Sequence, residues 1–161
     1  MKNLAYAAPE PAGSQGHLLN LYVPRGTGGP VPVVLWVAGS GGLLENGRDG
    51  SNLVAAHLNP AGIAVAGVAI RSSGNATFPG RLSDIKAALR WLRANAARDH
   101  LDPGRIGILG ESSGGWTAVM AAVTGGNAAL EATWACRAAP ARCRARSPSP
   151  RPPTSGRWTR T

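Results

Sequence analysis

One serine of this 161-residue chain lies between glycines at a spacing that could support nucleophilic catalysis. Residues 110–114 read Gly-Glu-Ser-Ser-Gly and match the pattern G-x-S-x-G, in which small residues let the backbone reverse sharply around the serine. Such a turn holds the hydroxyl clear of a sheet edge at the positive end of a helix dipole, where a base can reach it and negative charge is stabilised. Ser112 is therefore the candidate nucleophile.

The residues on either side of this pattern supply the context that it requires. The apolar run 106–109 precedes it and predicts a strand, and apolar residues from Trp116 to Val123 recur after it at helical spacing. In such a turn a side chain at either flanking glycine would clash. A glycine-rich turn without chemistry is the alternative, and the strand–turn–helix context argues against it.

A second glycine-rich loop, Ala-Gly-Ser-Gly-Gly at 38–42, follows the apolar run 31–37. Where side chains are missing, backbone N–H groups can point into a common space and hold a developing oxyanion, which stabilises an acyl-transfer transition state by roughly 3 kcal/mol. A plain glycine turn is the alternative for this loop taken alone. Its presence beside a serine turn favours the oxyanion interpretation.

Apolar runs and helical periodicities alternate along the chain. The run 31–37 is almost continuously apolar, as in a strand covered on both faces, so we expect it in the centre of a sheet. The strongest helical periodicity follows Phe78–Gly80. The alternation predicts an α/β fold with a mostly parallel sheet and helices on both faces. The predicted strands are 4–7, 18–23, 31–37, 63–70 and 106–109, and the predicted helices are 53–58, 82–96 and the segment after Ser113.

The polar residues of the long helix and its surroundings are expected to have structural rather than catalytic roles. Its charged residues, including Lys86, are expected to face water while the apolar face packs. Asp84, in the first turn, is expected to stabilise the helix N-terminus or to pair with an arginine such as Arg105. The segment Leu101–Gly104 is predicted to form a turn.

The net charge of +9 comes mainly from one end of the chain. Residues 1–131 carry ten Lys and Arg against eight acids, whereas residues 132–161 carry seven Arg and no acid. The second segment also lacks any aliphatic residue larger than alanine, which predicts a disordered basic tail after a partial domain at 1–131. The abrupt change in composition suggests a truncated or frameshifted gene, a hypothesis that translation of all three frames after codon 126 would test.

Together the ordered motifs resemble the α/β-hydrolase superfamily, and within it the esterase and lipase branch that includes bacterial feruloyl-esterase-like (BD-FAE-like) proteins. The resemblance implies the N-terminal portion of an α/β-hydrolase fold and a serine-dependent carboxylic ester hydrolase for small-molecule esters. It assigns Ser112 as nucleophile and the N–H groups of Ser113 and around Ser40 and Gly41 as the oxyanion hole. It covers residues 14–126 and rests on Ser14–Leu19, the loop 39–42, Phe78–Pro79, Asp84–Arg93, Leu101–Pro103 and Gly110–Gly115.

Two departures from the family pattern affect the expected activity. Many esterases of this branch carry His-Gly-Gly-Gly where this chain has Ala38–Gly41. The fold also orders its catalytic residues as Ser, acid, His, but after Ser113 this chain has no histidine, no aspartate and only Glu131 as an acid. The upstream histidines are expected to be surface or capping residues. We therefore predict very little turnover from this chain.

A non-catalytic role is the alternative: a hydrolase-like scaffold whose basic tail binds nucleic acid or acidic surfaces without specificity. No interleaved aromatic residues indicate specific nucleic-acid recognition. The apolar runs are far shorter than the roughly 18–20 residues that span a bilayer, and no signal peptide is visible, so we predict a cytoplasmic protein without a membrane span. Cys136 and Cys143 match no zinc or redox motif, and we predict no cofactor or metal.

Overall fold

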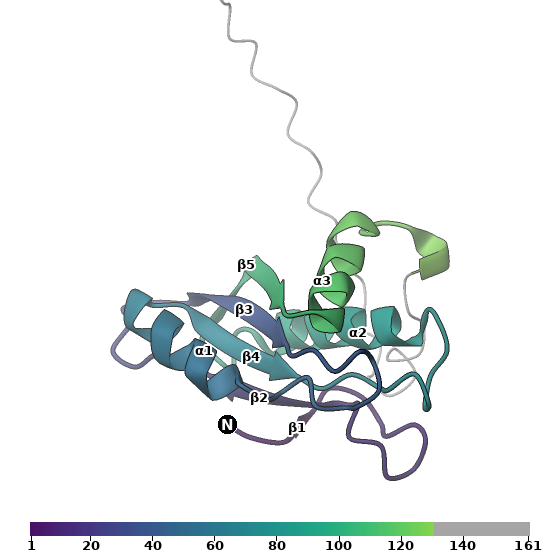
Figure 1. Ribbon diagram of the computed structural model, residues 1–161. Helices are drawn as coiled ribbons and strands as arrows, with labels where there is room; N and C mark the ends of the chain where they lie inside the picture. Colours follow the sequence, from purple (N-terminus) through teal and green to yellow (C-terminus); the bar gives the residue numbers. More distant parts are fainter. Residues whose placement is uncertain (131–161) are drawn as a thin grey trace, which may run out of the picture.

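The computed structural model describes residues 1–130, which form a five-stranded sheet with helices on both faces (Figure 1). The strands are β1 (Leu4–Ala5), β2 (Leu18–Tyr22), β3 (Val31–Val37), β4 (Ala64–Val68) and β5 (Leu101–Gly110). The helices are α1 (Ser51–Leu58), α2 (Gly80–Asn95) and α3 (Ser113–Val123), with short 3-10 helices at Asn59–Ala61 and Ala128–Leu130. The predicted tail 132–161 and both cysteines lie outside the described residues.

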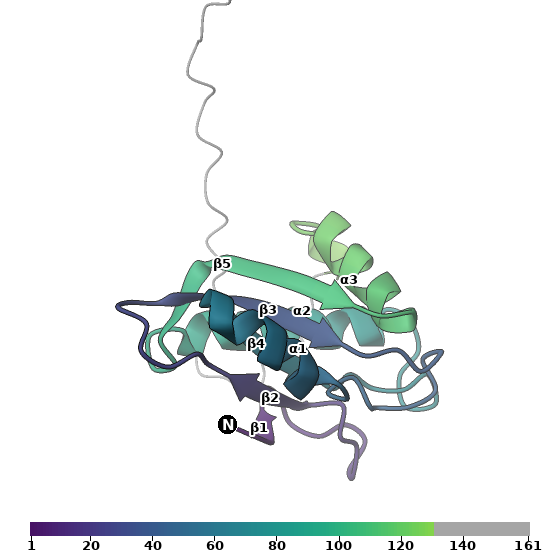
Figure 2. The same cartoon turned by 60° about the vertical axis from the view of Figure 1, so that its left-hand side comes forward.

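The order of the strands is β1-β2-β4-β3-β5. β4, β3 and β5 run parallel, and β1 and β2 run antiparallel to form one side of a mixed sheet. Figure 2 shows α1 in front of the sheet and α2 behind it. The predicted α/β fold is confirmed, with β3 at the centre of the three parallel strands as expected.

Helices cover the central strands on both sides. All five residues of β4 are buried, and its small side chains let helices approach closely. On β3 alternate residues from Val31 to Val37 are fully buried, whereas Val34 and Trp36 on the other face are only half-buried. The Trp36 indole N–H donates to the Asp49 carbonyl at 2.6 Å, just before α1 begins. The expectation that β3 is covered on both faces is therefore met fully on one face and partly on the other.

Lys86 of α2 contradicts its sequence-based expectation, and Asp84 pairs with an arginine as expected, although with a different one. Lys86 was expected in water, but it is buried because its ammonium group reaches the end of α3 and donates to the Thr124 carbonyl at 2.9 Å. The partner of Asp84 is Arg71 at 2.7 Å, whereas Arg105 lies in the first half of β5 and pairs there with Asp102 at 2.6 Å.

The segment Leu101–Gly104, predicted to be a turn, is the beginning of β5. Leu101 pairs with Val31 of β3, and a register irregularity between Val31 and Val33 accommodates the residues that follow. The turn signal reflects a local bond, because the Gly104 N–H donates to the Asp102 carboxylate at 2.8 Å. Within the segment only Leu101 has a register partner on β3 before pairing resumes at Ile106, so Asp102 and Gly104 keep this local bond inside the irregular start of the strand.

Three of the apolar residues that mark one side of α3 are largely exposed, whereas Met120 packs against the core. The exposed fractions are 50% for Trp116, 61% for Val119 and 70% for Val123. The helix packs instead through small residues, such as Gly114 and Ala118, against β3 and β5. Among the described strands β5 is the outermost on this side, so its outer edge is unpaired (Figure 2).

Candidate active site

Ser112 lies in the turn between β5 and α3. Its backbone has φ 51° and ψ −122°, a combination that residues other than glycine rarely adopt and that stores conformational strain. The residue is exposed, and no hydrogen bond within residues 1–130 engages its hydroxyl. This geometry presents a free hydroxyl beside the N-terminus of α3, where partial positive charge favours an alkoxide or an oxyanion.

Glycines make this turn possible through close backbone contacts. A Cβ on Gly110 would lie 2.5 Å from the Gly114 carbonyl carbon, and a Cβ on Gly114 would collide with the Val37 carbonyl oxygen. A Cβ on Gly39 would lie 2.6 Å from the Ser112 Cβ. The expected clash at both flanking glycines is confirmed, and the glycine loop packs directly on the serine turn.

The glycine loop 39–42 follows β3 and lies against the same turn. The Ser40 N–H donates to the Ser113 Oγ at 3.2 Å, so this N–H already has an acceptor. By contrast, the N–H groups of Gly41 and Ser113 make no hydrogen bond within the described part of the chain. The structure therefore brings Ser40 beside Ser113 and the adjacent Gly39 beside Ser112, with Gly41 next along the loop. Within residues 1–130 the N–H groups of Gly41 and Ser113 are free, and the Ser113 side chain occupies that of Ser40.

Glu45 connects the glycine loop with two other segments. Its carboxylate accepts hydrogen bonds from the Ser14 hydroxyl at 2.8 Å, the Gln15 N–H at 2.6 Å, the Asn75 amide at 2.8 Å and the Ser72 N–H at 3.4 Å. Burial raises the pKa of Glu45, but these hydrogen bonds outweigh burial and hold the pKa below its ordinary value. Sequence analysis missed this residue, because its partners are distant in the chain.

A buried ion pair joins the loop after β4 to α2. The Arg71 guanidinium donates to the Asp84 carboxylate at 2.7 and 3.1 Å, and the Arg71 N–H donates to it at 2.9 Å. Burial raises the pKa of Asp84 above its ordinary value, and the bonds from Arg71 offset only part of this rise. The pair fixes the start of α2 relative to the loop 71–80.

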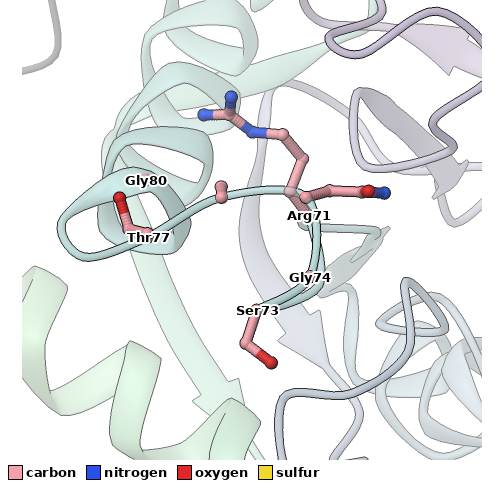
Figure 3. Close-up of a pocket in the computed structure, with 7 residues that line it drawn as sticks. Arg71, Ser73, Gly74, Thr77 and Gly80 are labelled. Atoms are coloured by element: carbon pink, nitrogen blue, oxygen red, sulfur yellow. The ribbon is translucent and has the colours of Figure 1, made fainter.

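The loop 71–80 borders a surface pocket of about 370 Å³ (Figure 3). Its lining is mainly polar, with the hydroxyls of Ser73 and Thr77 and the Asn75 amide, and in Figure 3 the Arg71 side chain extends toward α2. The Ser73 N–H donates to the Gly42 carbonyl at 2.8 Å, which connects this loop to the glycine loop. The pocket therefore adjoins the segment that carries the candidate oxyanion donors.

Two exposed aromatic rings link the same loop to α3. Phe78 and Trp116 meet edge to face with their ring centroids 6.4 Å apart. Trp116 is one turn beyond Ser112 on α3, and the Trp116 N–H donates to the Ser112 carbonyl at 3.0 Å. The pair forms an apolar surface close to the serine turn.

None of the three histidines within residues 1–130 is placed beside Ser112. His100 precedes β5, whose ends pair with Val31 and Val37 of β3, so it lies roughly 20 Å from the serine turn. His57 is on α1, with its Nδ1 2.8 Å from the Leu53 carbonyl oxygen. His17 precedes β2, which is three strands, about 14 Å, from β5. The described part of the chain therefore supplies no histidine base to the serine.

Residues 1–130 contain no cluster of three or more His, Cys, Asp or Glu side chains that could hold a metal ion. In the same range, no helix has the length and apolar character needed to cross a membrane.

Comparison with known proteins identifies the family. A sequence profile of the BD-FAE family matches residues 19–143, well over half of the chain. The chain belongs to the BD-FAE family. The BD-FAE match begins and ends later than the segment 14–126 on which the motifs rest, and its last residues lie outside the described part. The α/β-hydrolase esterase family expected from the motifs is confirmed.

Curated relatives of this BD-FAE chain include ester hydrolases of Mycobacterium tuberculosis. The carboxylesterase NlhH is 38% identical over 105 residues, which cover 64% of this chain and 33% of NlhH. The probable carboxylic ester hydrolase LipM is 31% identical over 96 residues, covering 60% of this chain and 22% of LipM. The BD-FAE chain thus spans a third or less of the length of these relatives.

Solved structures give the same assignment. The bifunctional GH43-CE protein of Bacteroides eggerthii superposes with a TM-score of 0.71 at 38% identity, covering 77% of this BD-FAE chain and 17% of that protein. Phosphonate-inhibited esterase B of Lactobacillus rhamnosis superposes with a TM-score of 0.70 at 27% identity, covering 81% of this chain and 41% of the esterase.

Proposed function

We propose that this chain carries the nucleophile of a serine carboxylic ester hydrolase that acts on small-molecule esters. The observation that carries the proposal is the strained backbone of Ser112, at φ 51° and ψ −122°, between β5 and the N-terminus of α3. The Ser112 oxygen would attack the ester carbonyl carbon while a base removes the hydroxyl proton. Loss of the alcohol would leave an acyl-serine, which water then hydrolyses.

The oxyanion formed in this step would be stabilised by backbone N–H groups. Those of Gly41 and Ser113 are free within residues 1–130, and both belong to segments that pack on the Ser112 turn. The Ser40 N–H would join them only after it leaves the Ser113 Oγ. Fixed donors of this kind typically contribute roughly 3 kcal/mol each to transition-state stabilisation.

Turnover by this chain is expected to be residual. Residues 1–130 place no histidine near Ser112, and the sequence after Ser113 contains no histidine or aspartate. Without a base, the remaining rate would come from substrate binding and the oxyanion donors alone.

Covalent labelling tests the nucleophile without requiring turnover. The full chain is incubated with a fluorophosphonate ester, with and without imidazole as an external base, and the modified residue is identified by mass spectrometry. We expect slow labelling at Ser112 that imidazole accelerates, that Ser112→Ala abolishes and that the control Ser83→Ala on α2 preserves. Equal labelling of the Ser112→Ala protein would refute the nucleophile. Substantial p-nitrophenyl acetate turnover that Ser112→Ala abolishes would refute only the residual-activity prediction.

The segregation of charge supports a second role. Residues 132–161 hold seven Arg and no acid, which favours weak, salt-sensitive binding of nucleic acid or acidic surfaces. In filter-binding assays, removal of residues 132–161 is expected to abolish retention of single-stranded RNA, while Ser112 labelling persists. Retention by the shortened chain would contradict this role.

A further inference from the structure

Arg81, the second residue of α2, lies beside the glycine loop and has no partner among residues 1–130. Its guanidinium lies against Gly42, where an added Cβ would collide with Nη1. Nη1 is buried, and no hydrogen bond or ion pair within residues 1–130 reaches any nitrogen of this guanidinium. A buried charged donor without an acceptor costs free energy that a bound anion would recover.

The neighbouring carboxylates have other partners. Asp84 receives the side-chain and backbone donors of Arg71, and Glu45 receives four hydrogen bonds from other residues. Burial lowers the pKa of Arg81 and the Asp84 charge raises it, but a guanidinium stays protonated in proteins. Arg81 therefore keeps a full positive charge. The Asp84 carboxylate attracts this charge but forms no ion pair with it.

The glycine loop adds unpaired donors next to this charge. Within the described residues, the N–H groups of Gly41 and Gly42 make no hydrogen bond, and both glycines have positive φ, 62° and 85°. The same loop touches the nucleophile turn, since a Cβ on Gly39 would lie 2.6 Å from the Ser112 Cβ. Gly42, which contacts the guanidinium, is thus three residues along the loop from Gly39, which contacts Ser112.

We propose that Arg81 and the Gly42 N–H bind a carboxylate, so that the esters accepted at this site carry a negative charge. The planar guanidinium fork matches the geometry of a carboxylate, whose charge strengthens each hydrogen bond. The ester part of the inference rests on the proposed function, whereas anion binding itself requires no catalysis.

A titration of the ¹⁵N-labelled full chain tests this with two esters that differ in one charge. Monomethyl succinate has one ester and one carboxylate, and dimethyl succinate has two esters and no charge. We expect monomethyl succinate to shift the amide signals of Gly41 and Gly42 saturably, with the neutral diester roughly 10- to 100-fold weaker, the factor typical of a charged hydrogen bond. Arg81→Gln should remove this preference, and Arg93→Gln, an exposed arginine of the same helix, should retain it.

The outcomes separate anion binding from catalysis. Equal shifts with both esters, or no shift at the two glycines, would overturn the proposal. Because this comparison is made on the unaltered chain, it tests the proposal even if the Arg81→Gln variant does not fold. Shifts confined to residues 132–161 would mean that only the arginine-rich segment binds anions, and would overturn it too. Binding that persists in Ser112→Ala while Ser112 resists labelling would retain the anion site and reject the nucleophile.

Discussion

The Ser40 N–H donates to the Ser113 Oγ at 3.2 Å, joining residues 73 positions apart in the sequence. The residue after the candidate nucleophile thus holds the glycine loop in place through its side chain, while its own N–H has no acceptor in the part of the chain that the structure describes. One residue would then both position the loop and serve as a donor to the oxyanion.

The variant Ser113→Ala tests the positioning role. Loss of one neutral hydrogen bond costs about 1 kcal/mol, which corresponds to a roughly fivefold faster opening of the Ser40 amide. Hydrogen exchange followed by NMR measures this, with the Leu43 amide, bonded to the Ser40 carbonyl at 3.1 Å, as the internal reference. Unchanged exchange at Ser40 would show that the hydroxyl does not hold the loop.

The close approach of the glycine loop to the serine turn predicts a strong effect of Gly39→Ala. The new methyl group would meet the Ser112 Cβ at 2.6 Å and the Glu111 carbonyl oxygen at 2.7 Å, so we expect a loss of roughly 1–3 kcal/mol in the free energy of unfolding. Urea denaturation followed by circular dichroism measures it. The control Gly28→Ala has open space around the new Cβ and should not destabilise the chain. Equal stability of the two variants would contradict the packing.

The hydrogen bonds to Glu45 predict an acid-dependent loss of stability. Because its folded-state pKa is lower than its unfolded value, its contribution is fully present above the unfolded pKa, about 4.3, and is lost as the pH falls through the folded pKa. Urea midpoints between pH 3 and pH 6 should therefore decline less steeply in Glu45→Gln than in the unaltered chain. Asp49→Asn, the same change at an exposed carboxylate, should leave the slope unchanged. Identical slopes for Glu45→Gln and the unaltered chain would contradict this role.

The buried pair of Arg71 and Asp84 predicts strong destabilisation by Asp84→Asn. The Asp84 side chain is fully buried, and its loss of charge leaves the Arg71 guanidinium, 9% exposed, without its main counter-ion. We expect a loss of about 3–5 kcal/mol in the free energy of unfolding. Asp102→Asn, which breaks an exposed pair with Arg105, should have little effect. Similar urea midpoints for the two variants would exclude a structural role for the buried pair.

Local patterns predicted the elements of the fold well. The apolar run that became β3 and the periodicity that became α2 depend on burial of one stretch of chain at a time, so their signals are contiguous. The turn predicted at Leu101–Gly104 was wrong because Leu101 pairs with Val31 and the segment begins β5, in an irregular stretch where pairing resumes only at Ile106. The expectation that Lys86 faces water was wrong because its partner, the Thr124 carbonyl, lies at the end of another helix.

The candidate site was predicted only in part. The nucleophile turn and the glycine loop have glycine signatures that sequence analysis could recognise, although their assigned roles stay predictions. Glu45 and Arg81 have no such signature, because a single carboxylate or arginine gains significance only from the segments folded around it. The contact between Ser40 and Ser113 has no local signature either, since it joins two motifs that are 73 positions apart in the sequence.

The order of the strands also affects how the chain folds during synthesis. β3 and β4 pair early, but the other edge of β3 has to wait for β5, about 60 residues after β3 ends. At the usual elongation rates this delay lasts roughly 3–12 s. For that time, the nascent chain exposes an unpaired apolar strand on the ribosome, where a chaperone that binds extended apolar segments would have its best opportunity to engage it.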